Sequence, residues 1–167
     1  YYIVEDKMAK YDKLINILLQ EHREILEILS EEEQDLRKIV ESSDNLETLQ
    51  ERGEVLEATT DLSVKITKVS SLLKEHGGLE EVSIYPILKK LKHDEEVNRL
   101  IKNHEVMIQL LKANEELIEK YRLKKIGLRE LADETYRIYM RLKNIVTSHI
   151  KLEEGLFNKL IKIKAIH

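Results

Sequence analysis

Apolar residues recur at helical spacing along almost the whole chain, and this periodicity restricts the fold more than any other feature of the sequence. Four apolar runs are separated by polar segments. They extend over residues 14–29, 62–88, 100–117 and 128–160. A stripe of this kind is stable only when another element covers it. The sequence therefore predicts four long helices whose apolar faces meet in one core.

The polar breaks between these runs set the expected boundaries. They read "ESSDNLET", "KKLKHDEE" and "RLKKIG", and the only proline, Pro86, stands just before the second. We expect one domain over residues 1–167, with helices at about 5–41, 54–90, 94–123 and 128–164. Ser43, Asp44 and Asp94 are the expected N-caps, and an irregular segment or a short extra helix is expected between about 41 and 54. Short connections favour an all-α, antiparallel up-down-up-down four-helix bundle, whereas the breaks argue against one long coiled coil.

Composition excludes several classes of function. The chain has no cysteine, so disulfides, thiol catalysis and iron–sulfur ligation are excluded, and any metal must bind through nitrogen and oxygen. A net charge of −4 argues against nucleic acid and acidic membrane surfaces as main partners. The sequence shows no apolar run long enough to span a bilayer and no signal-peptide pattern. We therefore expect a cytoplasmic protein with neither nucleic acid nor membrane as a partner.

One histidine interrupts the apolar face of each predicted helix, and two of these histidines have a glutamate one turn later. The residues are His22, His76 with Glu80, His104, and His149 with Glu153. Residues at i and i+4 share a helix face. In an antiparallel pair, residues at equal height are equidistant from the turn, and the midpoints of successive histidines fall at 49, 90 and 126–127, on or near the three breaks. All four histidines can thus lie in one layer, which His93 and the terminal His167 are not expected to join.

Metal ligation accounts for such a layer most directly. Two buried carboxylates without compensation would cost several kcal/mol, although protonated histidines could pair with them in a purely structural polar layer. Six nitrogen and oxygen ligands exceed the need of one tetrahedral zinc. They suit two ions bridged by both carboxylates and a shared oxo or hydroxo group, with about one open position each. Imidazole and carboxylate together favour iron, with manganese or zinc as alternatives.

The order of ligands within each motif distinguishes this chain from other helical metal proteins. The HExxH zinc motif is absent, and the Glu-x-x-His motif of ferritin-like proteins is reversed to His-x-x-x-Glu. The reversed order resembles the hemerythrin-like (HHE cation-binding) domain: an isolated histidine, then "HGGLEEVSIYP" (76–86), then His104, then "HIKLEEGLFNKL" (149–160). The resemblance implies that the six residues named above ligate a non-haem di-iron centre. We assign no separate catalytic or cofactor-binding residues.

Two departures from this family bear on function. Oxygen-carrying hemerythrins have a fifth histidine ligand and an aspartate in place of one glutamate, and no clear fifth histidine is seen here. Gly77 stands where relatives often carry an aromatic or acidic residue. On a helix, Gly77 flanks the site and Gly78 points away from it. We expect Gly77 to keep space beside the metals, for a ligand or for a close helix contact.

Three functions are consistent with these features. The first is a di-iron protein that binds O2, NO or peroxide for sensing, storage or scavenging. The second is an oxidase, peroxidase or iron–sulfur-repair enzyme, in which Glu81 and Glu154 are candidate acid–base groups and Tyr85, Tyr136 and Tyr139 candidate electron relays. The third is a metal-stabilised interaction module with a fused or separate partner domain. The sequence leaves open whether the protein is an enzyme.

Overall fold

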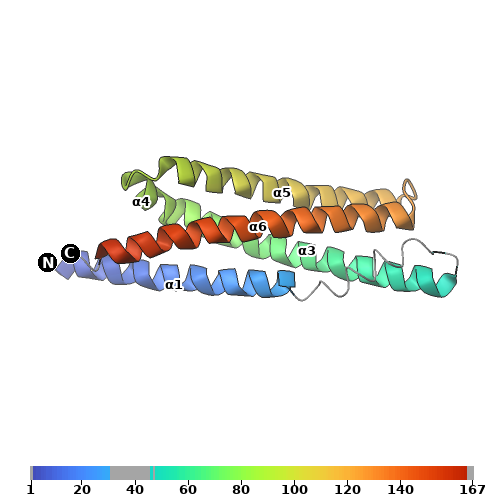
Figure 1. Ribbon diagram of the computed structural model, residues 1–167, viewed down its shortest axis with the longest axis horizontal. Coiled ribbons are helices and arrows are strands. Elements are labelled where there is room, and N and C mark those ends of the chain that lie inside the picture. The colour runs from blue at the N-terminus through green and yellow to red at the C-terminus, as the bar shows by residue number, and fades with distance from the viewer. Residues whose placement is uncertain (1, 31–45, 47, 165–167) are drawn as a thin grey trace.

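The computed structural model describes residues 2–30, 46 and 48–164, with side chains for residues 11–30, 46 and 48–162. The described elements are all helices: α1 (Tyr2–Ser30), α3 (Leu49–Ser83), α4 (Tyr85–Lys90), α5 (Asp94–Arg122) and α6 (Leu128–Lys164). The four long helices lie side by side as a bundle (Figure 1). This confirms the predicted all-helical four-helix-bundle class. Residues 31–41, Ser43 and Asp44, for which helix and caps were expected, lie outside the described residues.

The second long helix begins at Leu49, so the expected start at about 54 is wrong. Thr48 is its N-cap: the Thr48 hydroxyl accepts a hydrogen bond from the Glu51 amide (3.1 Å), and the Glu51 carboxylate accepts one from the Thr48 amide (2.8 Å). This reciprocal pair satisfies two amide groups at the helix end. The sequence signature is Thr-x-x-Glu, and Gly53 inside the first turns does not prevent the helix from forming.

The expected single helix over 54–90 is interrupted at Ile84. Because Pro86 has no amide hydrogen, the regular bonding of α3 ends at Ser83, and the short α4 starts at Tyr85. The chain stays helical in direction, since the amides of Ile87 and Leu88 both bond the Ile84 carbonyl. Asp94 was the expected N-cap of α5, but the N-cap is His93, and Asp94 is the first residue of the helix.

Two lysines close α4 and α5 in an unusual way. Lys92 (φ 64°) and Lys124 (φ 56°) adopt the left-handed conformation just after these helices. The amide of Lys124 bonds the Tyr121 carbonyl, and the next amide bonds the Lys120 carbonyl; α4 ends with the same pair of bonds. These are Schellman closures, in which glycine is the usual residue. Both turns are therefore tight, but at a conformational cost that glycine would avoid.

The core consists of two apolar clusters with a polar layer between them. The larger cluster includes Ile25, Leu73, Met107 and Val146, and the smaller one includes Leu18, Ile84, Leu100 and Leu156. Along α1 and α5 the smaller cluster precedes the polar layer, whereas along α6 and from the end of α3 into α4 it follows the layer. Successive long helices thus pass the layer in opposite directions (Figure 1). None of the described helices is both long and apolar enough to cross a membrane.

Candidate metal centre

The polar layer contains all six residues that the sequence nominated. They form two groups that share both carboxylates: one with His22 and His76, the other with His104 and His149, and each with Glu80 and Glu153. Within each group the candidate ligand atoms lie within 4.8 Å of one another. Five of the six residues are 0–2% exposed, and His104 is 7% exposed. Every long helix contributes one histidine, so the layer forms only when the whole bundle assembles.

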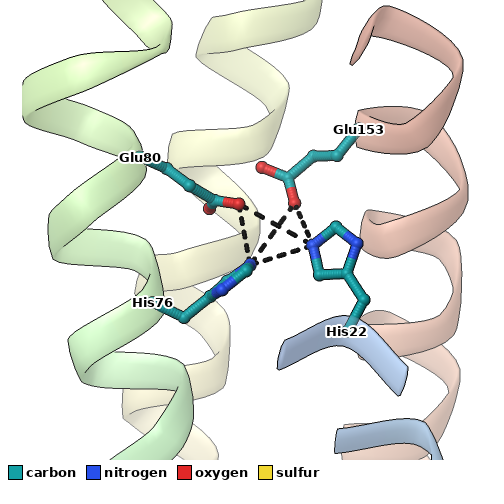
Figure 2. Close-up of side chains that lie close together, drawn as sticks. All are labelled: His22, His76, Glu80 and Glu153. Atoms are coloured by element: carbon teal, nitrogen blue, oxygen red, sulfur yellow. Dashed lines mark hydrogen bonds and ion pairs between the residues drawn. The ribbon is translucent and has the colours of Figure 1, made fainter. Parts of the chain in front are cut away.

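The first group is drawn in Figure 2, where side chains from α1, α3 and α6 point toward one another. The Nε2 atoms of His22 and His76 are 2.9 Å apart. Glu80 Oε1 lies 2.7 Å from His76 Nε2, and Glu153 Oε2 lies 3.2 Å from His22 Nε2. Four donor atoms of the kind that bind transition metals thus face one small volume.

The second group repeats this arrangement with the other two histidines. The Nε2 atoms of His104 and His149 are 3.1 Å apart. Glu80 presents its other oxygen, Oε2, to His104 (3.5 Å), whereas Glu153 presents the same Oε2 to His149 (3.2 Å). Glu80 therefore divides its two oxygens between the groups, and Glu153 faces both groups with one. The two glutamates occupy equivalent positions in the sequence motif, but they face the two histidine groups with different numbers of oxygens.

Three further glutamates contact the outer nitrogens of the histidines. Glu21 lies 2.6 Å from His76 Nδ1, Glu81 lies 2.9 Å from His104 Nδ1, and Glu154 lies 3.4 Å from the Nδ1 of the α1 histidine. Because a carboxylate only accepts hydrogen bonds, each of these Nδ1 atoms must carry the hydrogen. In a neutral ring the inner Nε2 then presents a lone pair.

Tyr85 is the polar residue that closes the layer on the α4 side. Its hydroxyl donates to Glu153 Oε1 (2.5 Å) and lies 3.2 Å from Glu80 Oε2. Burial, together with the two carboxylates, raises the pKa of the Tyr85 hydroxyl, so the group stays a donor. Because the Tyr85 hydroxyl occupies Oε1 of Glu153, only Oε2 of this carboxylate faces the two histidine groups.

The electrostatics of the cluster favour positive charge. Burial alone lowers the pKa of His76 and of His149, but the contacts of these rings with Glu153 and Glu80 outweigh it and raise the values to about 10 and about 9. The pKa of His22 is raised by the same balance. Burial alone would raise the pKa of both glutamates, yet the imidazoles hold that of Glu80 well below its usual value and bring that of Glu153 to about 2. Without a cation, the site therefore attracts protons.

These observations test whether the residues fit a metal. In the first group, where carboxylates place hydrogens on both outer nitrogens, the Nε2 lone pairs of His22 and His76 face each other at 2.9 Å and repel unless a positive charge lies between them. Glu80 Oε1 and Glu153 Oε2 are buried and accept no hydrogen bond among the described residues. The orphaned oxygens and the converging lone pairs fit a cation in each group.

The two glycines of α3 differ sharply in their surroundings. A Cβ on Gly77 would lie 2.9 Å from Cε1 of the His104 ring, whereas a Cβ on Gly78 would have nothing within 4 Å. Gly77 thus permits the close approach of an imidazole from the neighbouring helix. Of the two roles expected for Gly77, space for a ligand or a close helix contact, this is the helix contact. Gly78 points away from the site, as its helical position indicated.

The sequence reasoning missed some residues and assigned others differently. Glu21 was not nominated, although it directly precedes a ligand candidate. Glu81 and Glu154 were considered as acid–base groups, and they lie against histidine rings instead. His93 contacts Glu96 (3.3 Å) and belongs to neither group. His167 lies outside the described residues.

The fold and the site together define a class of protein: a helical bundle whose core holds a buried histidine–carboxylate cluster able to hold cations. The family model described as the hemerythrin HHE cation binding domain matches residues 13–161. The chain belongs to this family, as its motifs indicated, and cation binding is the property that the family description carries. Comparison with curated proteins gave no match, and comparison with solved structures gave none either.

Proposed function

We propose that the protein holds two iron ions and binds a small ligand, O2, NO or peroxide, for sensing, storage or scavenging. His22 and His76 would hold one ion and His104 and His149 the other. Glu80 and Glu153 would be shared, with an oxo or hydroxo bridge between the ions. The observation that supports this most strongly is the convergence of four histidine nitrogens and two carboxylates in two buried groups, with Glu80 Oε1 and Glu153 Oε2 accepting no hydrogen bond among the described residues.

The surroundings of the cluster support binding of a small, uncharged ligand. When bound, iron ions supply coordination positions that such ligands can occupy. The layer lies between two apolar clusters, and in such surroundings electrostatic interactions are stronger than in water. Glu81 and Glu154, the two candidate acid–base carboxylates, are engaged with histidine rings. That arrangement supports a positioning role for them and favours ligand binding over acid–base turnover.

The test is metal analysis and optical spectroscopy of protein purified from iron-replete cells. We expect about two irons per chain and an absorption spectrum that changes on adding O2, NO or peroxide. Glu80→Ala and Glu153→Ala should each reduce the content below two. Turnover assays with peroxide then separate a binding protein from an oxidase or peroxidase. A wild-type chain that binds no iron, manganese or zinc would rule the proposal out.

Chelation provides a second, spectrum-independent test. A cation that binds only the folded chain stabilises it by mass action, by about 2.7 kcal/mol at a hundredfold excess over Kd. Removing the cations should therefore lower the melting temperature by several degrees. Identical melting curves before and after chelation would show that the cluster does not bind cations tightly.

A further inference from the structure

Each His-x-x-x-Glu-Glu motif supports a histidine on another helix. In the first motif, Glu81 accepts a hydrogen bond from His104 Nδ1 at 2.9 Å. The Tyr85 ring from the same segment stacks on His104, with centroids 6.0 Å apart and planes inclined by 15°. One carboxylate and one aromatic ring thus fix the orientation of His104.

The second motif provides the same pair of contacts. Glu154 lies 3.4 Å from His22 Nδ1, and Phe157 stacks on His22 with centroids 6.1 Å apart and planes inclined by 7°. The centre therefore has an approximate internal two-fold arrangement. In this arrangement His22 of α1 and His104 of α5 occupy equivalent places.

The remaining two histidines break this symmetry. His76 Nδ1 lies 2.6 Å from the Glu21 carboxylate. His149 Nδ1 is buried and has no hydrogen-bond partner among the described residues. Glu21 directly precedes the α1 histidine, and the residue that directly precedes the equivalent α5 histidine is Asn103. The sequence has an asparagine, Asn103, where the equivalent position before His22 has a glutamate, and the structure lacks a carboxylate beside His149 Nδ1.

We propose that the two cation positions are unequal, and that the position between His104 and His149 binds its cation more weakly and exchanges it first. The inference rests on the proposed function. A carboxylate on the outer nitrogen of a ligating histidine fixes the ring and raises its basicity, and its loss costs about 10- to 100-fold in metal affinity. His22 and His76 each have such a carboxylate. In the second position, His104 has one and His149 does not.

Access to the centre favours the same position. A cavity of about 210 Å³ lies between α3 and α5 and reaches the His104 ring, beside Gly77. Its other walls include the apolar side chains of Met107 and Ile108. His104 is also the most exposed of the six candidate ligands, at 7% against 0–2% for the rest. A cation or a small uncharged ligand would therefore reach this position first.

The first measurement is stepwise removal of Fe(II) from the loaded wild-type protein by a chromogenic chelator without oxygen. We expect two phases of one iron each, with rates at least tenfold apart. Two irons lost in one phase would overturn this inference and leave the proposed function standing. A chain that takes up no iron would overturn both.

Restoring the missing carboxylate gives a gain-of-affinity test. Asn103→Glu should slow the fast phase about 10- to 100-fold and leave the slow phase unchanged. Glu21→Asn should accelerate the slow phase by a similar factor. Lys102→Glu, at the exposed neighbouring position, is the control for added charge. An unchanged fast phase in Asn103→Glu, or equal slowing in Lys102→Glu, would show that the missing contact does not set the difference.

The access route is tested by narrowing the cavity. Ile108 lines it and is 38% exposed, while Ile118 lies on the same helix with 40% exposure and does not line it. Ile108→Trp should slow the fast phase several-fold, and Ile118→Trp should not change it. Both positions are near the surface, so the fold should tolerate the larger ring. Equal rates in the two variants would overturn the route through this cavity.

Discussion

Replacing Gly77 with alanine places a methyl group against the His104 ring, and Gly78→Ala provides a matched control in the next residue of the same helix. At Gly78 the new methyl group meets nothing within 4 Å. Alanine is more favourable than glycine inside a helix by about 0.5–1 kcal/mol. Gly78→Ala should therefore raise the free energy of unfolding by about that amount.

At Gly77 the same gain is opposed by a clash. The new Cβ would lie 2.9 Å from His104 Cε1, and ordinary contact begins at 3.4 Å, so the ring must retreat by about 0.5 Å. The ring has little freedom, because Glu81 holds Nδ1 and Tyr85 covers one face. Overpacking of this kind costs about 1–3 kcal/mol. Because the helix term is common to both variants, Gly77→Ala should be less stable than Gly78→Ala by about 1–3 kcal/mol.

The assay is urea denaturation of both metal-free variants, followed by far-ultraviolet circular dichroism. Iron removal from the loaded variants provides an independent readout, since a displaced His104 should weaken its cation position in Gly77→Ala alone. Equal unfolding free energies in the two variants would refute the idea that Gly77 is required by the His104 ring.

Three further outcomes follow from the cluster and its surroundings. The pKa values of His76 and His149 are raised in the folded chain from 6.5 to about 10 and about 9. Their contribution to the free energy of unfolding is therefore complete below pH 6.5 and is lost as pH rises through 9 and 10. The pKa of Glu153 is lowered from 4.5 to about 2, so its contribution is complete above pH 4.5 and is lost as pH falls toward 2. Denaturation of the metal-free protein should therefore show a fall of at least about 1.4 kcal/mol, one pKa unit, on going from pH 6.5 to 10, and a flat profile there would contradict these shifts. Tyr85→Phe removes a buried donor to a carboxylate and should lower the unfolding free energy by about 1.5–3 kcal/mol, measured by the same denaturation. Lys124→Gly relieves a left-handed residue and should raise the melting temperature slightly, with a gain of up to about 1 kcal/mol; a lower melting temperature would count against strain at this turn.

Local periodicity and spacing were sufficient to predict four long helices and to predict that the six candidate ligands lie in one layer. A histidine such as His104, three or four residues from apolar neighbours, must share their face of the helix, and its height is set by its distance from the turn. Both quantities can be read from one chain without knowing how the helices rotate against one another. The start of α3 was also encoded locally, by Thr48 and Glu51, although the expected boundary, at about 54, fell later in the sequence.

The contacts around the ligands could not be predicted in this way. Which ring the Glu21 carboxylate reaches depends on the rotation of α1 against α3 to within a fraction of a turn, and the partner lies 55 residues away. The role of Tyr85 depends on the break that Pro86 introduces, because it places the start of α4 beside the carboxylates. Predicting these contacts requires the rotation of each helix, whereas predicting the ligand layer requires only the apolar face of each helix and the position of its turn.

Charge balance links the inner ligands to the outer glutamates and bears on the number of cations. The two inner glutamates bring two negative charges, and Glu21, Glu81 and Glu154 bring three more at the edge of the layer. Counting the five carboxylates alone, before any oxo or hydroxo bridge, one divalent cation would leave three negative charges uncompensated in a partly buried site, whereas two would leave only one, which the solvent at the exposed edge can screen. The outer glutamates are about 36–44% exposed, so solvent reaches them while they contact the rings. The same carboxylates that orient the histidines therefore support the proposal of a second cation, and the missing one beside His149 supports the proposal that this second cation is the easier to lose.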